Sequence, residues 1–165
     1  MAKQKTLDDL FLDTLKDIYY AERQILKALP KMARAASSED LAEAFRAHKE
    51  ETEGQVERLQ EIFEILGKPA RGKTCEAIQG IIAESEEIIE DFKGTPALDA
   101  GLISSAQAVE HYEMARYGTL LAWSRQMGMK DVAKLLEETF EQESKADLDL
   151  SKLAEKSINR SAEAA

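Results

Sequence analysis

The chain has 165 residues, enough for one domain with a full hydrophobic core and too few for two ordinary domains. Its 22 Lys and Arg against 32 Asp and Glu give a net charge of −10, so we expect neither nucleic acid nor an anionic membrane as a partner. No apolar run could span a bilayer, the N-terminus lacks a signal-like stretch, and the single cysteine, Cys75, excludes an internal disulfide. We therefore expect an acidic, cytoplasmic, single-domain protein.

Long helices are predicted by the placement of the 8 glycines and 3 prolines, which fall at a few breaks in the chain. Thr6 is expected to cap the first helix and Ser37 or Ser38 the second. Thr95-Pro96 is a good start signal for the third long helix, and the last eight residues are expected to fray. The breaks separate five predicted helices, at about 6–34, 38–66, 74–93, 96–127 and 130–157.

Apolar residues in the four long helices recur at alternating steps of three and four, as from Phe11 through Ile18 and Ile25 to Met32. This spacing is typical of the seams of a left-handed helical bundle. Two short turns make hairpins of the first and second and of the third and fourth long helices, and residues 67–95 connect the hairpins. The sequence predicts an all-α four-helix bundle over residues 1–165, with one long crossover connection that carries the fifth, shorter helix.

Carboxylates interrupt the apolar pattern midway along the long helices. Glu22 and Glu51 lie equally far from the first turn, and Glu113 and Glu143 lie at nearly the same distance from the second. Each distance corresponds to about 22–23 Å of helix, the middle of a bundle about 42 Å long. We therefore expect these four glutamates, one from each long helix, to converge at one level.

Further candidate ligands flank this level. Glu110 and Asp147 lie one turn deeper, and His48 stands three residues before Glu51 on the same face. Each has a plainer interpretation by itself: a lone glutamate on a seam is commonly solvated, and a lone histidine is commonly a satisfied core residue. His111 falls off the seam, and Tyr117 is interpreted as core packing, with a hydrogen bond to the site as the alternative.

Buried carboxylates cost several kcal/mol each unless a positive charge compensates them. No Lys or Arg occupies the four seam lines, and Arg116, three residues after Glu113, could not serve four acids. A pair of divalent cations would compensate all four at once. Carboxylates with imidazole suit iron or manganese, and di-metal sites of this kind occur in bundle cores.

Four segments resemble the YciF-like bacterial proteins of the ferritin superfamily, and the resemblance covers about residues 6–156. The segments are Tyr20–Gln24, His48–Gln55, Val109–Glu113 and Tyr117–Thr119. The resemblance implies a ferritin-like bundle with a mid-bundle di-metal centre and a connection to bacterial stress responses. It implies no settled reaction.

One departure from the usual ferritin-like pattern is visible. That pattern has Glu-x-x-His on the second and fourth helices, but here Gly54 and Ala146 stand where the histidines would be. The second-helix motif is reversed, with His48 before Glu51, and Asp147 and Gln55 are the expected substitutes. The site would be rich in carboxylate, which favours hard metal states.

Two functions follow as hypotheses. The first is a di-iron protein that oxidises ferrous iron with oxygen or peroxide, manganese being the alternative metal, with Glu22, Glu51, Glu113 and Glu143 as ligands and then Glu110, His48 and Asp147. The second is a non-catalytic stress protein that acts by association, with a vestigial or structural metal centre. Iron storage would need a closed shell of many chains. A homodimer is expected from large residues off the seams, namely Tyr19, Phe63, Phe92 and Trp123.

Overall fold

The computed structural model describes residues 4–164, which contain helices and no strand. The four long helices are α1 (Leu7–Ala35), α2 (Glu39–Ile65), α4 (Leu98–Gln126) and α5 (Lys130–Leu153). The other helical segments are α3 (Glu76–Asp91), a π-helical turn (Ala154–Ile158) and α6 (Asn159–Glu163).

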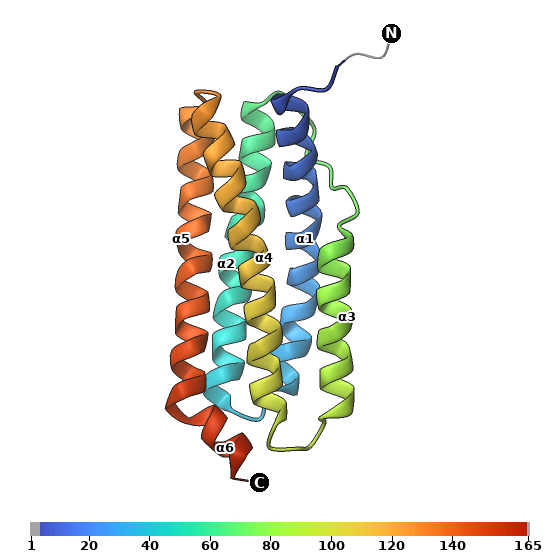
Figure 1. The fold of residues 1–165 in the computed structure, drawn as a ribbon, viewed down its shortest axis with the longest axis vertical. Coiled ribbons are helices and arrows are strands. Elements are labelled where there is room, and N and C mark those ends of the chain that lie inside the picture. Colours follow the sequence, from blue (N-terminus) through green and yellow to red (C-terminus); the bar gives the residue numbers. More distant parts are fainter. Residues whose placement is uncertain (1–3, 165) are drawn as a thin grey trace.

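Two antiparallel hairpins, α1–α2 and α4–α5, pack together as a four-helix bundle (Figure 1). The connecting helix α3 lies outside the bundle along α1 and α4. Because α3 returns the chain to the end where α2 began, α2 and α4 run in the same direction. The predicted fold class, a bundle with one long crossover and a fifth helix, is confirmed. None of the helices in residues 4–164 combines the length and apolar character that crossing a membrane requires.

The ends of the hairpin helices follow local sequence signals. Thr6 caps α1 in a capping box, since its hydroxyl accepts from the Asp9 amide while the Asp9 carboxylate accepts from the Thr6 amide. Ser38 caps α2 by accepting from the Leu41 amide. Gly67 and Gly128 follow α2 and α4 with φ of 64° and 71°, a left-handed conformation that glycine adopts without strain.

The start of α4 differs from the prediction. The helix begins at Leu98, and the Thr95 hydroxyl donates instead to the carbonyl of Phe92 at 2.8 Å. Asp99 in the first turn accepts from the backbone amides of Ser37 and Ser38, each at 2.8 Å. This long-range contact joins the start of α4 to the α1–α2 turn, so tertiary structure rather than local capping positions α4.

The C-terminal segment also differs from the prediction. Residues 158–163 are helical rather than frayed, because the π-helical turn and α6 pack against α4. Ala154 and Ile158 are buried in this contact. Buried apolar surface therefore orders a segment in which the sequence offers no end signal.

The large residues off the seams are mostly internal. Tyr19 and Phe63 are buried and pack edge to face, with ring centroids 5.5 Å apart, and Trp123 packs partly buried against the core. Only Phe92 of the four is exposed, at 45%. Three of these side chains thus stabilise the chain's own fold, and Phe92 alone still supports association.

Candidate metal centre

Four helices place ionisable side chains at one level in the middle of the bundle. Glu22 comes from α1, His48 from α2, Glu110 and Glu113 from α4, and Glu143 from α5. Glu22, Glu113 and Glu143 are fully buried, and Glu110 and His48 are 2% and 8% exposed. We call these five residues the buried cluster. Apolar core surrounds it on both sides, with Ile18 and Ile25 on α1 and Ala106 and Leu120 on α4.

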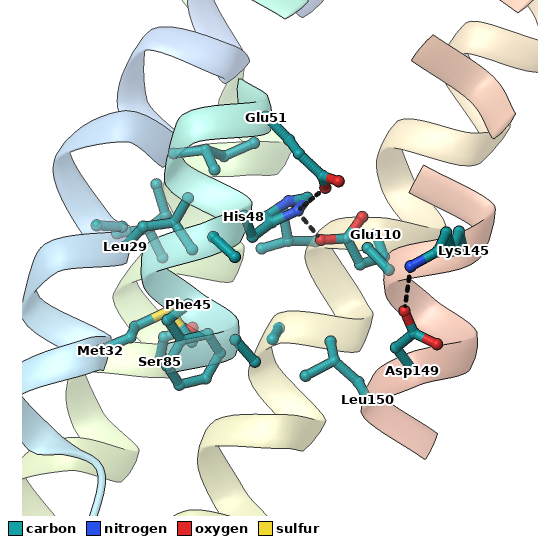
Figure 2. Close-up of a pocket in the computed structure, with 18 residues that line it drawn as sticks. Leu29, Met32, Phe45, His48, Glu51, Ser85, Glu110, Lys145, Asp149 and Leu150 are labelled. Atoms are coloured by element: carbon teal, nitrogen blue, oxygen red, sulfur yellow. Dashed lines mark hydrogen bonds and ion pairs between the residues drawn. The ribbon is translucent and has the colours of Figure 1, made fainter. Parts of the chain in front are cut away.

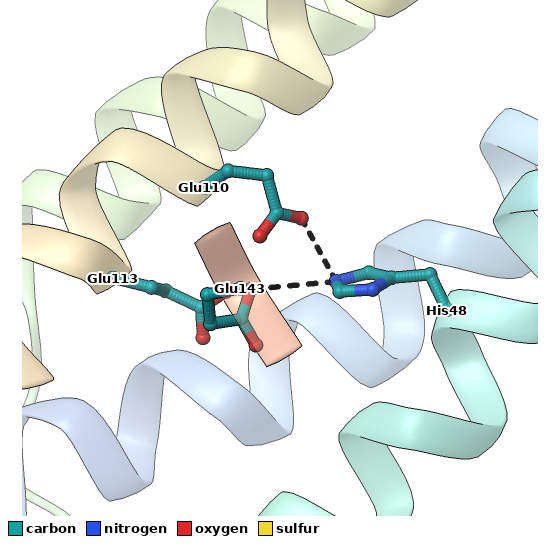
Figure 3. Close-up of side chains that lie close together, drawn as sticks. All are labelled: His48, Glu110, Glu113 and Glu143. Atoms are coloured by element: carbon teal, nitrogen blue, oxygen red, sulfur yellow. Dashed lines mark ion pairs between the residues drawn. The ribbon is translucent and has the colours of Figure 1, made fainter. Parts of the chain in front are cut away.

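Polar atoms of four members of the buried cluster converge on one small volume, namely those of His48, Glu110, Glu113 and Glu143 (Figure 3). His48 Nε2 lies 2.8 Å from Glu110 Oε1 and 3.7 Å from Glu143 Oε2. One ligand atom from each of His48, Glu110, Glu113 and Glu143 lies within 4.8 Å of all the others. The 2.8 Å contact is close enough for a hydrogen bond but lacks its directionality, because Nε2 has no correctly oriented partner among residues 4–164.

Most acceptors in the buried cluster are unsatisfied. Both carboxylate oxygens of Glu113 and of Glu143, and Oε2 of Glu22 and of Glu110, find no hydrogen-bond donor within the described part of the chain. Buried polar atoms are nearly always hydrogen-bonded, so orphans gathered at one place require an explanation. Carboxylate oxygens and an imidazole nitrogen facing one point are the donor set that a hard or borderline divalent cation takes.

Basic side chains do not compensate the cluster. Across the described ranges, no Lys or Arg forms an ion pair with any of its four glutamates. Arg116 lies instead over the Tyr112 ring, 5.2 Å from its centroid, and Arg58 donates to Thr139 and Gln142. His48 is therefore the cluster's one basic side chain among residues 4–164.

The cluster's pKa values show what this arrangement costs. Burial, and then the charge of Glu143, raises the pKa of Glu22 to about 8, although the Tyr117 hydroxyl opposes the shift by donating to Glu22 Oε1 at 2.5 Å. Burial and neighbouring carboxylates also raise the pKa values of Glu113 and Glu143 well above the ordinary range. Burial alone would lower the pKa of His48, but contacts with Glu110 and Glu51 raise it.

Glu51 is the predicted residue that does not reach the centre. Its side chain is 41% exposed, and its Oε2 lies 3.4 Å from His48 Nδ1 (Figure 2). The reason is angular: His48, Thr52 and Gln55 form the buried face of α2, and Glu51 lies beside that face. The expectation that Glu51 converges with the other three glutamates is wrong, and His48 is the α2 residue at the centre.

Of the flanking candidates, Glu110 and His48 belong to the buried cluster, whereas Asp147 and Gln55 lie around it. Asp147 Oδ2 lies 3.1 Å from Nε2 of the exposed His111, and its buried Oδ1 has no partner among residues 4–164. Gln55 is fully buried and donates to Gln142 Oε1 at 3.3 Å. Asp147 thus pairs with the histidine that sequence reasoning placed off the seam, one turn from Glu143.

The polar contacts around the cluster were only partly predictable from the sequence. Tyr117 packs in the core as expected, and its hydroxyl also donates to Glu22, the alternative that its place one turn after Glu113 indicates. The bonds from Arg58 to Thr139 and Gln142 join α2 to α5, and no local pattern indicates them.

An all-helical bundle with a buried carboxylate–histidine cluster at mid-height is the class of protein that this fold and site define. Residues 6–163 match the family model described as a domain of unknown function, DUF892, so the chain belongs to this family. The chain is 45% identical over 160 residues to Protein YciF of Escherichia coli, covering 96% of both chains. It is a member of the YciF-like stress-protein family.

Solved structures agree with this assignment. The crystal structure of the stress protein YciF from Escherichia coli matches with a TM-score of 0.90 at 44% identity, over 94% of this chain and 99% of that one. YcfI of Rhodopseudomonas palustris, whose description proposes a structural role, matches with a TM-score of 0.88 at 43% identity, over 92% and 97% of the two chains. A Xanthomonas campestris protein matches at 22% identity with a TM-score of 0.69, covering 91% and 92%, and shares the fold alone.

Proposed function

We propose that the buried cluster binds two ferrous ions and promotes their oxidation by oxygen or peroxide. The observation that carries the proposal is the set of orphaned carboxylate oxygens on Glu113 and Glu143. Two ferrous ions carry four positive charges, which equal the charge of the four ionised glutamates of the cluster, Glu22, Glu110, Glu113 and Glu143. Bridging carboxylates are the ligands of two-metal sites, and iron bound there supplies one-electron chemistry toward oxygen or peroxide.

The chain's own residues have distinct roles in this proposal. The ions are held by the five residues of the buried cluster, namely Glu22, His48, Glu110, Glu113 and Glu143. Asp147, one helical turn from Glu143, is an additional candidate ligand. Glu51 orients His48: by accepting from Nδ1–H, it leaves Nε2 free as a ligand, the usual arrangement around metal-bound histidines. The Tyr117 hydroxyl holds Glu22 Oε1 and leaves the buried Oε2 available as a ligand atom. Manganese suits the same oxygen-rich donor set.

Metal analysis and anaerobic titration test this function. Protein expressed with iron supplementation should contain two iron ions per chain, and admission of oxygen or peroxide to the ferrous form should raise near-ultraviolet absorbance. The variants Glu113→Gln and Glu143→Gln should lose both properties. Glu141→Gln, an exposed substitution on the same helix as Glu143, is the matched control and should keep them. A parent protein that takes up no metal would refute the proposal.

A non-catalytic role is the second candidate, and the structural role proposed for YcfI favours it. In that case the cluster would hold a cation only to stabilise the bundle. Metal would then raise the melting temperature, whereas ferrous iron would oxidise in air no faster with the protein than in protein-free buffer. The oxidation rate therefore separates the two candidates, whereas metal content alone does not.

Association and location complete the proposal. We place the protein in the cytoplasm and assemble it as a homodimer through a face that includes the exposed Phe92. Light scattering should give a molar mass twice that of the chain, and the Phe92→Asp variant should have the mass of a single chain. A parent that stays monomeric at high concentration would contradict the dimer without touching the metal centre.

A further inference from the structure

A cavity of about 180 Å³ adjoins the buried cluster on the side of the α1–α2 turn (Figure 2). Its walls are apolar, with Leu29 from α1, Phe45 from α2, Val109 from α4 and Leu150 from α5. Alanines, among them Ala106 and Ala146, stand where larger side chains would fill the space. Close packing leaves few voids of this size in a protein interior, so the cavity is an unusual feature.

Two unsatisfied polar groups form one end of this cavity. His48 and Glu110 both line it, both are more than nine-tenths buried, and His48 Nε2 and Glu110 Oε2 have no hydrogen-bond partner among residues 4–164. The solvent side lies between α2 and α5, where Glu51 is 41% exposed and the Lys145–Asp149 ion pair is 73% and 48% exposed. The cavity therefore has an apolar body, a polar inner end and a way in from solvent.

We propose that this cavity binds one small neutral molecule of the phenol class, with the ring among Leu29, Phe45 and Leu150 and the hydroxyl toward Glu110. A dry apolar cavity of about 150 Å³ takes a benzene ring, so the volume here admits a ring with one polar substituent. The hydroxyl donates to Glu110 Oε2, an acceptor that remains even when Oε1 is engaged with His48 or a cation. The site goes beyond the proposed iron chemistry and does not require a metal.

Charge selects against anionic ring compounds of this size. A carboxylate on the ligand would meet the glutamates of the buried cluster, so benzoate is excluded by repulsion. A neutral hydroxyl avoids this repulsion and can donate to the orphaned Glu110 Oε2 at the inner end.

Calorimetric or NMR titration of the metal-free full chain tests the site. Phenol should bind one-to-one with a dissociation constant on the order of 1 mM or tighter, as expected for seven heavy atoms. Benzoate should show no saturable binding. Failure of phenol to bind, or saturable binding of benzoate, would overturn the proposal, and neither outcome depends on whether iron is oxidised.

Cavity variants locate the bound ring. Ala106→Leu should fill the cavity and raise the dissociation constant for phenol at least tenfold. Ala146→Leu should fill it from α5 with the same effect, and it replaces the first variant if circular dichroism shows that Ala106→Leu fails to fold. Ala115→Leu, an exposed change of equal size on α4, is the control and should leave binding unchanged. Leu150→Ala should enlarge the cavity enough to admit 1-naphthol, which the parent rejects. Unchanged phenol binding in both filling variants would place the ligand elsewhere and refute the assignment.

Glu110→Gln tests the orientation of the ligand. The amide keeps the size of the side chain but removes the charge of the acceptor, so phenol should bind at least threefold more weakly while toluene is unaffected. Equal effects on phenol and toluene would show that the hydroxyl does not face Glu110.

Discussion

Several carboxylates on the surface of this bundle pair with a Lys or Arg, whereas the glutamates of the buried cluster pair with neither in the described part of the chain. On the surface, Glu137, Glu53 and Asp13 each pair with a Lys or Arg at 2.6–2.7 Å. In the interior, four glutamates share one histidine and, within residues 4–164, no Lys or Arg. Yet the surface charges, solvated by water, need compensation least. The contrast indicates that the interior charges are compensated by something outside the chain, either protons or cations.

Cation binding should have the largest effect on this contrast. If ferrous ions compensate the cluster, saturating metal should stabilise the fold by about 4 kcal/mol when the free ion exceeds its dissociation constant a thousandfold. Anaerobic thermal unfolding with and without ferrous iron measures this, and Glu143→Gln should abolish most of the increase. An unchanged melting temperature at saturating metal would mean that protons alone compensate the cluster.

The pH dependence of the metal-free protein should be the next largest effect. Glu22 has a pKa near 4.5 when unfolded and about 8 when folded, so between these values the folded state holds a proton that the unfolded state has lost. Stability should therefore fall as pH rises from 4.5 to 8, by about 1.4 kcal/mol per pH unit for each such group. The raised pKa of His48 acts in the same direction, because that contribution is also lost as pH rises through the folded value. Urea unfolding across this range measures the slope, and a stability that rises with pH without metal would contradict it.

Neutralising one interior carboxylate should have an intermediate effect. Without metal, Glu143→Gln should stabilise the protein by about 1–3 kcal/mol at pH 8, where the parent must ionise buried groups or hold costly protons. At pH 5 the gain should nearly vanish, because the parent carboxyl is then protonated. Urea unfolding at both pH values measures the difference. Glu141→Gln on the exposed face of α5 should change stability little at either pH, and equal behaviour of the two variants would remove the interior–surface contrast.

Removing the hydroxyl that supports Glu22 should cost about 1–2 kcal/mol. In Tyr117→Phe, Glu22 Oε1 loses its donor at 2.5 Å in a fully buried position. The pKa of Glu22 should rise further, because the bond to Tyr117 lowers it in the parent. Chemical unfolding compares this variant with Tyr112→Phe. The Tyr112 hydroxyl donates to Asp17 at a partly buried site, so its removal should lower the free energy of unfolding by less. A larger loss in Tyr112→Phe would show that the Glu22 contact is unimportant.

The position of each glutamate along the bundle axis was predictable from the sequence. Whether its side chain points into the core was harder to predict. Because an α-helix rises by a constant amount per residue, counting from the turns placed Glu22, Glu113 and Glu143 at one level. The same count placed Glu51 there too, although its side chain lies beside the buried face of α2. The axial position of a residue depends on its own helix alone, but the burial of its side chain depends on where the neighbouring helices lie.

Features made by several helices together were beyond the reach of local patterns. Asp99 fixes the start of α4 through the distant amides of Ser37 and Ser38, and the C-terminal helical turns depend on packing against α4. The cavity beside His48 likewise arises from small side chains on several helices. None of these has a periodicity or motif in the sequence, since each depends on residues brought together only by the fold.

The smallest expected effect is on the surface side of the contrast. Arg125 pairs with Glu137 at 2.6 Å, but the two side chains are 56% and 47% exposed, so water and salt screen the attraction. Arg125→Gln should therefore cost no more than about 0.5 kcal/mol, and 0.5 M salt should erase the difference from the parent. A double-mutant cycle with Glu137→Gln isolates the pair in urea unfolding experiments. A coupling energy as large as the effect of Glu143→Gln would mean that exposed charges also determine stability here, and the interior cluster would lose its distinction.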